Sequence, residues 1–173
     1  MDTNKEYKMS FISFIKPGIW PFIVTLFFII AYIPLMAYTY GTEQQLGAWL
    51  VAIVWIGFTG IPPILLHLDY FLNDKTKQLC INNAERFLLL LVDNVTQRIG
   101  YEEIERIEKY SSTKPDSFSR MHWFTYFYYR IVITGKEPIF ITSMVVGKLE
   151  KKVEGITFEY IFVPFPIIKR ERR

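Results

Sequence analysis

Two long uncharged stretches near the start of the chain constrain its fold more than any other feature. Residues 19–40 and 46–66 contain no Asp, Glu, Lys, Arg or His. At about 1.5 Å of rise per helical residue, each stretch can cross a hydrocarbon core of roughly 30 Å. The polar residues between them, 41–45, have the composition of a tight turn. The pattern predicts an N-terminal transmembrane helical hairpin over residues 19–68.

The charges that flank the hairpin predict its orientation. Lys5, Lys8 and Lys16 precede the first span, and Lys75 and Lys77 follow the second, whereas residues 41–45 contain no Lys or Arg. The positive-inside bias therefore predicts that both termini are cytoplasmic. The first apolar stretch is longer than the core of a signal peptide and no A-x-A-like site follows it, so we expect it to be retained. We expect an integral protein of the bacterial inner membrane, with a cytoplasmic or interfacial segment at residues 1–18.

The spans carry few features that suggest a function. The absence of charge within them argues against an ion or proton pathway, which usually needs buried acids or bases. Ala48 and Ala52 are two small residues one helical turn apart, which makes them a candidate helix-packing face within the chain or in a homo-oligomer.

Residues 69–173 change to short apolar alternations, which predict one β-rich cytoplasmic domain with a basic tail. Residues 78–81 form a first expected strand. Residues 86–92 and 96–99 flank Asp93-Asn94, a favourable tight-turn pair, and predict a hairpin. Residues 100–104 suggest a one-turn helix or tight connection, and residues 104–110 leave strand and helix both open.

The second half of this domain predicts another hairpin, a helix and a last strand. The aromatic segment 123–134 and residues 138–142 surround a turn at Gly135-Lys136-Glu137. Ser143 is a suitable N-cap for an amphipathic helix through Val153, with Gly155 as its stop. Residues 157–163 predict a final strand.

The order of these pieces resembles the bacterial pleckstrin-homology-like (PH-like) domains that follow membrane hairpins. The resemblance covers roughly residues 67–163 and rests on four segments: 98–104, Ile107-Glu108, 128–133 and 135–143. It implies an α+β protein whose β-rich domain is a partly open barrel with one helix packed over an end. It also implies protein or lipid contact at a membrane, without catalytic activity. The expected strand after the helix departs from the usual PH-like order.

Two groups of residues are candidates for surface contacts. Basic residues on the expected helix and in the tail are candidates for contact with an anionic membrane surface: Lys148, Lys151, Lys152, Lys169, Arg170, Arg172 and Arg173. The alternative is that these charges only reinforce orientation and solubility. Aromatic residues of the second hairpin form a candidate interaction strand: Trp123, Phe124, Tyr126 and Tyr128. The alternative for them is packing on the two faces of a sheet.

Residues that carry reactive chemistry are sparse. His67, His122 and Cys80 are scattered and lack the spacing of a metal site. No phosphate-binding glycine loop and no G-x-S-x-G motif occurs. Charges of both signs are interspersed, and the net charge is only +3, which argues against a nucleic-acid surface. We expect no enzyme activity, no cofactor and no metal.

The sequence thus predicts a non-enzymatic membrane protein that presents a PH-like interaction domain at the cytoplasmic face. The expected partners are membrane lipids and a protein, which the sequence does not identify. The alternatives are a lipid-contact or membrane-organising protein, or an accessory subunit of a membrane complex.

Overall fold

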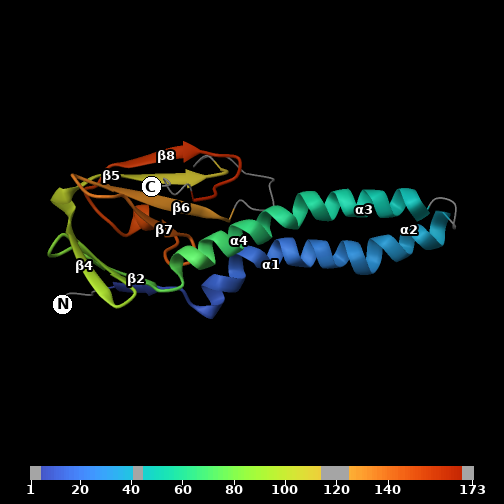
Figure 1. Ribbon diagram of the computed structural model, residues 1–173, viewed down its shortest axis with the longest axis horizontal. Coiled ribbons are helices and arrows are strands. Elements are labelled where there is room, and N and C mark those ends of the chain that lie inside the picture. Colours follow the sequence, from blue (N-terminus) through green and yellow to red (C-terminus); the bar gives the residue numbers. More distant parts are fainter. Residues whose placement is uncertain (1–4, 41–44, 114–124, 169–173) are drawn as a thin grey trace.

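The computed structural model describes residues 5–40, 45–113 and 125–168. It has two parts, a long antiparallel helical hairpin and a β-sheet domain at the open end of that hairpin (Figure 1). Helices and sheets occupy separate regions of the chain, which makes the protein α+β as predicted.

Each arm of the hairpin is an interrupted helix. The first arm consists of α1 (Phe11–Phe27), the π-helical segment η1 (Phe28–Tyr32) and α2 (Ile33–Tyr40). The second arm consists of α3 (Gln45–Thr59) and α4 (Ile61–Asp74), with Gly60 between them. Both interruptions lie beside prolines, Pro34 in α2 and the Pro62-Pro63 pair at the start of α4. A proline provides no N–H for the preceding helical turn, which explains the breaks.

Length and apolar composition single out one helix. Among the described residues, one helical stretch is long and apolar enough to cross a membrane. It is Trp49–Asp74, which runs through most of α3, Gly60 and all of α4. An apolar stretch in the first arm, Thr25–Met36, is shorter. The structure contains a helical hairpin, but two membrane-spanning helices are not shown, and insertion into a membrane stays a prediction.

The first sheet has the strand order β1-β2-β3-β4, all antiparallel. Its strands are β1 (Lys5–Lys8), β2 (Lys77–Asn82), β3 (Phe87–Val92) and β4 (Val95–Gly100). Asp93 and Asn94 both have positive φ, as a two-residue hairpin turn requires, so the predicted hairpin is confirmed. Strand β1 was not predicted, and it places the helical hairpin between two neighbouring strands of one sheet.

The second sheet has the strand order β7-β6-β5-β8. Its strands are β5 (Ile104–Ser111), β6 (Phe127–Ile133), β7 (Ile139–Thr142) and β8 (Phe158–Phe162). The predicted hairpin around Gly135 is confirmed, and residues 104–110, which the sequence left open, form a strand. The predicted final strand is also confirmed, and it pairs parallel to β5.

The two sheets enclose one hydrophobic core. Its fully buried members come from every strand of the two three-stranded meanders, β2–β4 and β5–β7. The short 3-10 helix η2 (Tyr101–Glu103) connects the sheets, and the side chain of Glu103 accepts a hydrogen bond from the N–H of Gly100 at 3.1 Å. The one-turn connection predicted at residues 100–104 is thus confirmed.

The predicted amphipathic helix over residues 143–153 is wrong. The structure has turns there and a single 3-10 helix, η3 (Leu149–Lys151). Met144, Val145 and Val146 are consecutive and all buried, but Met144 packs with α4 whereas the two valines enter the core between the sheets. Three consecutive buried residues do not fit an amphipathic helix, whose buried residues recur every three to four positions.

Candidate functional site

The candidate interaction strand lies against a helix. Tyr126 and Tyr128 are 0% and 3% exposed, and they pack on the side of the second sheet that α4 covers. Trp123 and Phe124 lie outside the described residues. The two described tyrosines therefore belong to the contact between hairpin and sheet rather than to an open groove, which corresponds to the packing alternative weighed for this strand.

Aromatic and apolar packing forms the centre of this junction. The Tyr70 ring of α4 meets the Tyr126 ring edge-on at 5.6 Å between centroids and the Tyr128 ring at 6.5 Å. Leu66, Met144 and Ile168 complete the buried cluster. Edge-to-face pairs of this kind stabilise by about 0.5–1.5 kcal/mol beyond the area that they bury.

Hydrogen bonds fix the register of α4 on the domain. The Tyr70 hydroxyl donates to the carbonyl of Pro166 at 2.8 Å, and the N–H of Ile168 donates to Asp69 Oδ2 at 2.9 Å. His67 Nδ1 lies 3.1 Å from the Tyr126 hydroxyl. These contacts attach the residue before β6 and the segment after β8 to the same helix.

A buried carboxylate ends the junction. Asp74, the last residue of α4, is 0% exposed, and its Oδ2 accepts hydrogen bonds from the Thr142 N–H at 2.9 Å and the Thr142 hydroxyl at 2.6 Å. Lys77 Nζ lies 3.6 Å from Asp74 Oδ1 and donates to the carbonyl of Phe140 at 2.7 Å. Because a buried charge needs both a counter-charge and donors, this arrangement ties the end of α4 to β7.

A second charged group occupies the outer face of the second sheet. The almost fully buried Glu108 side chain accepts bonds from Arg106 at 2.9 Å, Arg130 at 3.1 Å and Tyr110 at 3.0 Å. Burial raises the pKa of Glu108, but the bonds from Arg130, Tyr110 and Arg106 outweigh it and leave that pKa below its ordinary value. Arg106 also reaches Glu159 of β8 at 3.3 Å, so the cluster holds β8 to β5.

A hydrogen-bond network fixes η3 where the sequence predicted a longer helix. The Tyr129 hydroxyl donates to Glu150 Oε2 at 2.5 Å and accepts from the Leu149 N–H at 3.0 Å, and it lies 2.9 Å from the carbonyl oxygen of Gly147. Lys109 Nζ meets Glu150 Oε1 at 2.9 Å and lies 4.4 Å from the centroid of the Phe127 ring. Two strands thereby anchor a turn of three residues.

The predicted membrane-contact lysines lie on this turn. Lys148 and Lys151 are exposed. Lys152 is half-buried, and its Nζ lies 3.6 Å from the centroid of the Tyr7 ring in β1. Burial lowers the pKa of Lys152, and the nearby Lys5 lowers it further. Residues Lys169, Arg170, Arg172 and Arg173 lie outside the described part of the chain.

The predicted helix-packing face is placed in part. Ala52 is 1% exposed, so this position is already covered within the single chain. Ala48 belongs to the same helix, and its side chain lies outside the described ones. Nearby, the Phe28 ring of η1 stacks on the Trp55 ring of α3 at 4.8 Å between centroids. This stacking brings the π-helical segment against the second arm.

Within residues 5–40, 45–113 and 125–168, no group of three or more His, Cys, Asp or Glu side chains could hold a metal ion. The two carboxylates described above are held by cations and donors of the fold itself.

The fold and the junction together define a class: a domain of two packed sheets carried on a helical hairpin. A model of the PH domain family matches residues 3–151, and the chain belongs to that family. The matched range begins before β1 and includes the hairpin, β2–β7 and η3. No curated protein and no solved structure matches the chain.

Sequence reasoning missed the junction itself. Pro63, Leu66, Tyr70 and Asp74 are the buried residues of α4, and their spacing of three, four and four is that of one helix face. This spacing is visible in the sequence, and it indicates that the helix continues beyond residue 66, where the predicted span ends. The partners Thr142 and Pro166 carry no comparable signal, since nothing local indicates what they contact.

Proposed function

We propose that the chain is a non-enzymatic integral membrane protein. Its helical hairpin spans the bilayer and holds the PH domain at the cytoplasmic face, where the domain binds another protein. Membership of the PH domain family supports a protein- or lipid-interaction module.

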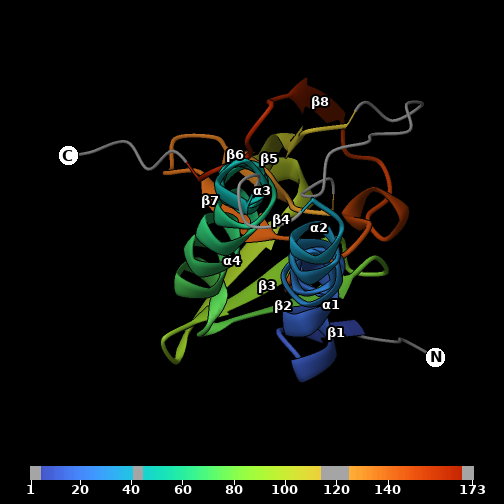
Figure 2. The ribbon, with the colours of Figure 1, turned by 90° about the vertical axis from the view of Figure 1, so that its right-hand side faces the viewer.

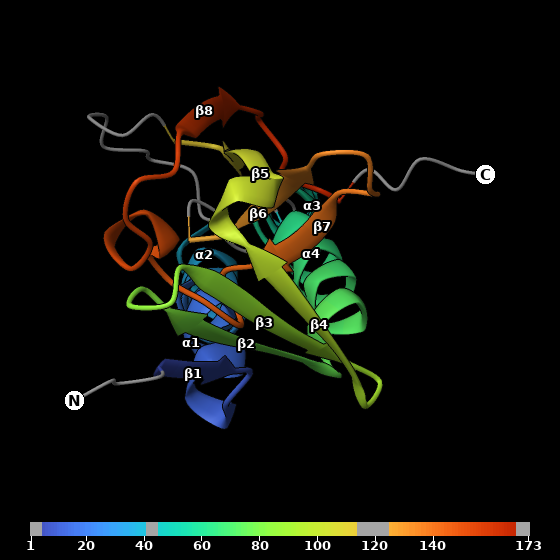
Figure 3. The ribbon, with the colours of Figure 1, turned by 90° about the vertical axis from the view of Figure 1, so that its left-hand side faces the viewer.

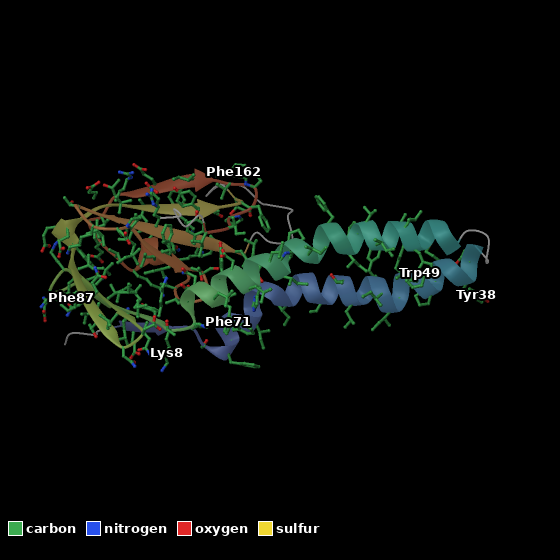
Figure 4. All side chains as sticks on the ribbon, in the orientation of Figure 1. Lys8, Tyr38, Trp49, Phe71, Phe87 and Phe162 are labelled. Atoms are coloured by element: carbon green, nitrogen blue, oxygen red, sulfur yellow. The ribbon has the colours of Figure 1, made fainter. Side chains whose placement is uncertain are left out.

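The distribution of exposed apolar side chains carries the membrane part of the proposal. Among the described large apolar side chains that are exposed, all lie on the hairpin except Val95, Tyr160, Phe162 and Ile167. Figure 4 shows these side chains projecting from both arms along the length of the hairpin. A continuous apolar surface of this extent favours lipid over water as its surroundings.

The orientation follows from the flanking charges. Lys5 and Lys8 lie in β1 and Lys75 follows α4, all at the domain end of the hairpin, whereas residues 41–45 of the sequence include no Lys or Arg. The positive-inside bias supports a cytoplasmic domain, and the membrane that we propose is the bacterial inner membrane.

A labelling experiment tests this topology. In a Cys80→Ser background, Thr39→Cys at the hairpin tip and Thr134→Cys in the β6–β7 turn provide single exposed thiols. A membrane-impermeant maleimide should label Thr39→Cys in intact cells and Thr134→Cys only after lysis. Labelling of both positions in intact cells, or of neither after lysis, would contradict the proposal.

Strand β4 is the binding surface that the geometry favours. It ends the first sheet, and Val95, Thr96, Gln97 and Arg98 are all exposed. Because β3 and β4 join through a two-residue turn, alternate residues of β4, including Thr96, direct their N–H away from β3. An extended segment of a partner could add to such an edge by main-chain hydrogen bonding.

Co-purification of the full chain tests the edge. Thr96→Pro removes the outward N–H and is compatible with an edge strand, whereas Thr96→Ala retains the N–H and serves as the control. We expect the proline variant to lose partners that the wild type and the alanine variant retain. The same partners recovered with all three proteins would overturn binding through β4.

A further inference from the structure

The start of α1 exposes large apolar side chains beside the domain. Phe11 and Ile12 are 78% and 75% exposed. Ser10 and Ser13 hydrogen-bond each other at this helix start, with the Ser13 N–H donating to Ser10 Oγ at 3.1 Å. The Phe14 ring packs 4.4 Å from the His67 ring of α4. Phe14 therefore fixes the first turn of α1 to the second arm, while Phe11 and Ile12 stay exposed.

The end of β8 exposes another apolar group. Phe162 is 52% exposed, and it pairs with Ser111, which pairs on its other side with Phe127. Phe127 begins β6 beside Tyr126 and Tyr128, where α4 is packed, so Phe162 lies at the hairpin end of the sheet. Figure 4 shows Phe162 and Phe71 at this end and Phe87 at the opposite end of the domain.

The segment after β8 extends this surface along α4. Bonds to Pro166 and Ile168 attach it to the helix, and Ile167 between them is 39% exposed. On α4 itself, Leu68 and Leu72 are 51% and 59% exposed. Single exposed apolar residues are ordinary on a protein surface, but here they gather at the one end of the domain that joins the hairpin.

The exposed groups lie on different sides of the hairpin. Seen along the hairpin, β8 lies on one side of the two arms and the first turn of α1 on the opposite side (Figure 2). Lys8 and Lys75 are exposed close to these apolar groups in the chain. Apolar side chains beside basic ones match the membrane interface, where acyl chains meet anionic headgroups.

We propose that the base of the domain, formed by Phe11, Ile12, Leu68, Leu72, Phe162 and Ile167, is seated in the interfacial layer of the bilayer. This inference rests on the proposed membrane insertion of the hairpin, because the apolar belt of the arms continues into the base. Contact on two sides of the hairpin, with α4 fixed to the sheet, sets the orientation of the whole domain. Strand β4 is then presented at a constant angle and height above the membrane.

Spin labels on the full chain, in nanodiscs of phosphatidylcholine and phosphatidylglycerol, test this position of the base. In the Cys80→Ser background, labels at Phe11→Cys and Phe162→Cys report the two sides of the base. A label at Ile53→Cys, exposed on α3, reports hairpin insertion. Thr134→Cys is the water-exposed control. It lies in the turn that follows β6, at the other end of that strand from Phe127. The measurement is the collision rate of each label with a water-soluble nickel chelate and with oxygen.

We expect labels at 11 and 162 to collide several-fold less with the nickel chelate than the label at 134, and more with oxygen. If the labels at 11 and 162 have the same collision rates as the label at 134 while the label at 53 is in lipid, the position of the base is overturned and the hairpin proposal stands. A label at 53 that also matches 134 would overturn both. Protection at only one of the two positions would overturn contact on both sides.

Discussion

Thr142 donates both its backbone N–H and its hydroxyl to one oxygen of Asp74, at 2.9 and 2.6 Å. The two residues come from β7 and from the end of α4, so this pair joins the hairpin to the domain. The hydrogen bonds from Tyr70 to Pro166 and from Ile168 to Asp69 also join α4 to the domain.

Thr142→Val should weaken that connection. The substitution retains the shape of the side chain but removes the hydroxyl donor, which leaves the buried Asp74 carboxylate with one bond fewer. We expect the free energy of unfolding to fall by about 1–3 kcal/mol. Thermal unfolding in detergent measures the loss. Thr134→Val, at an exposed turn position, is the matched control and should change stability little.

Tyr129→Phe should loosen η3. The variant loses the hydroxyl that contacts Gly147, Leu149 and Glu150, and the expected cost is about 1–3 kcal/mol. Hydrogen exchange over residues 147–152 should speed up more than exchange in β2 or β3. Tyr7→Phe, which retains the ring beneath Lys152, is the control. Equal exchange over residues 147–152 in wild type and variant would contradict the role given to this hydroxyl.

Glu108 should make stability depend on acid pH. Its pKa in the folded protein lies below the ordinary value, so its contribution is complete above the pKa of the unfolded chain, about 4.3. The contribution is lost as the pH falls through the lower folded pKa, because the unfolded chain takes up the proton first. The melting temperature of Glu108→Gln should fall less steeply than that of the wild type below about pH 4.3. Glu85→Gln, at an exposed ion pair with Arg98, should follow the wild type.

Ala52→Leu should disturb the hairpin. Ala52 is 1% exposed, so three added carbons have no space without displacement of the facing arm, at a cost of about 1–3 kcal/mol. Ile53→Leu, at a position 62% exposed, is the control and should be near neutral. A melting temperature in detergent that is the same for both variants would show that this position is not packed within the chain.

Local signals explain the parts of the fold that the sequence predicts. Asp93-Asn94 and Gly135 favour tight turns by themselves, and their positive φ angles follow from residue type. The apolar run Phe87–Val92 is short and bounded by turns, which favours a strand over a helix. The helix expected over residues 143–153 fails for a tertiary reason, because Met144 packs on α4 and Val145 enters the core between the sheets, and neither contact is visible in the sequence.

The candidate site depends on contacts between segments that are distant in the sequence, so less of it could be predicted. Four residues of β1 are too few for a pattern, and their partner strand begins only after the whole hairpin. The aromatic run was visible, but the cover that α4 provides over Tyr126 and Tyr128 was not. Figure 3, which views the domain from the end away from the hairpin, shows β1 beside β2 at the margin of the first sheet.

The position of the hairpin between β1 and β2 has a consequence for biosynthesis. Strand β1 is synthesised before the hairpin, yet Tyr7 meets its partner Leu79 only after both arms have been made. The pairing of β1 with β2 therefore waits until both arms have been made, and it closes a loop around them. A fragment that starts after the hairpin would leave the edge of β2 uncovered, so release of the domain by proteolysis would yield an aggregation-prone product rather than a soluble module.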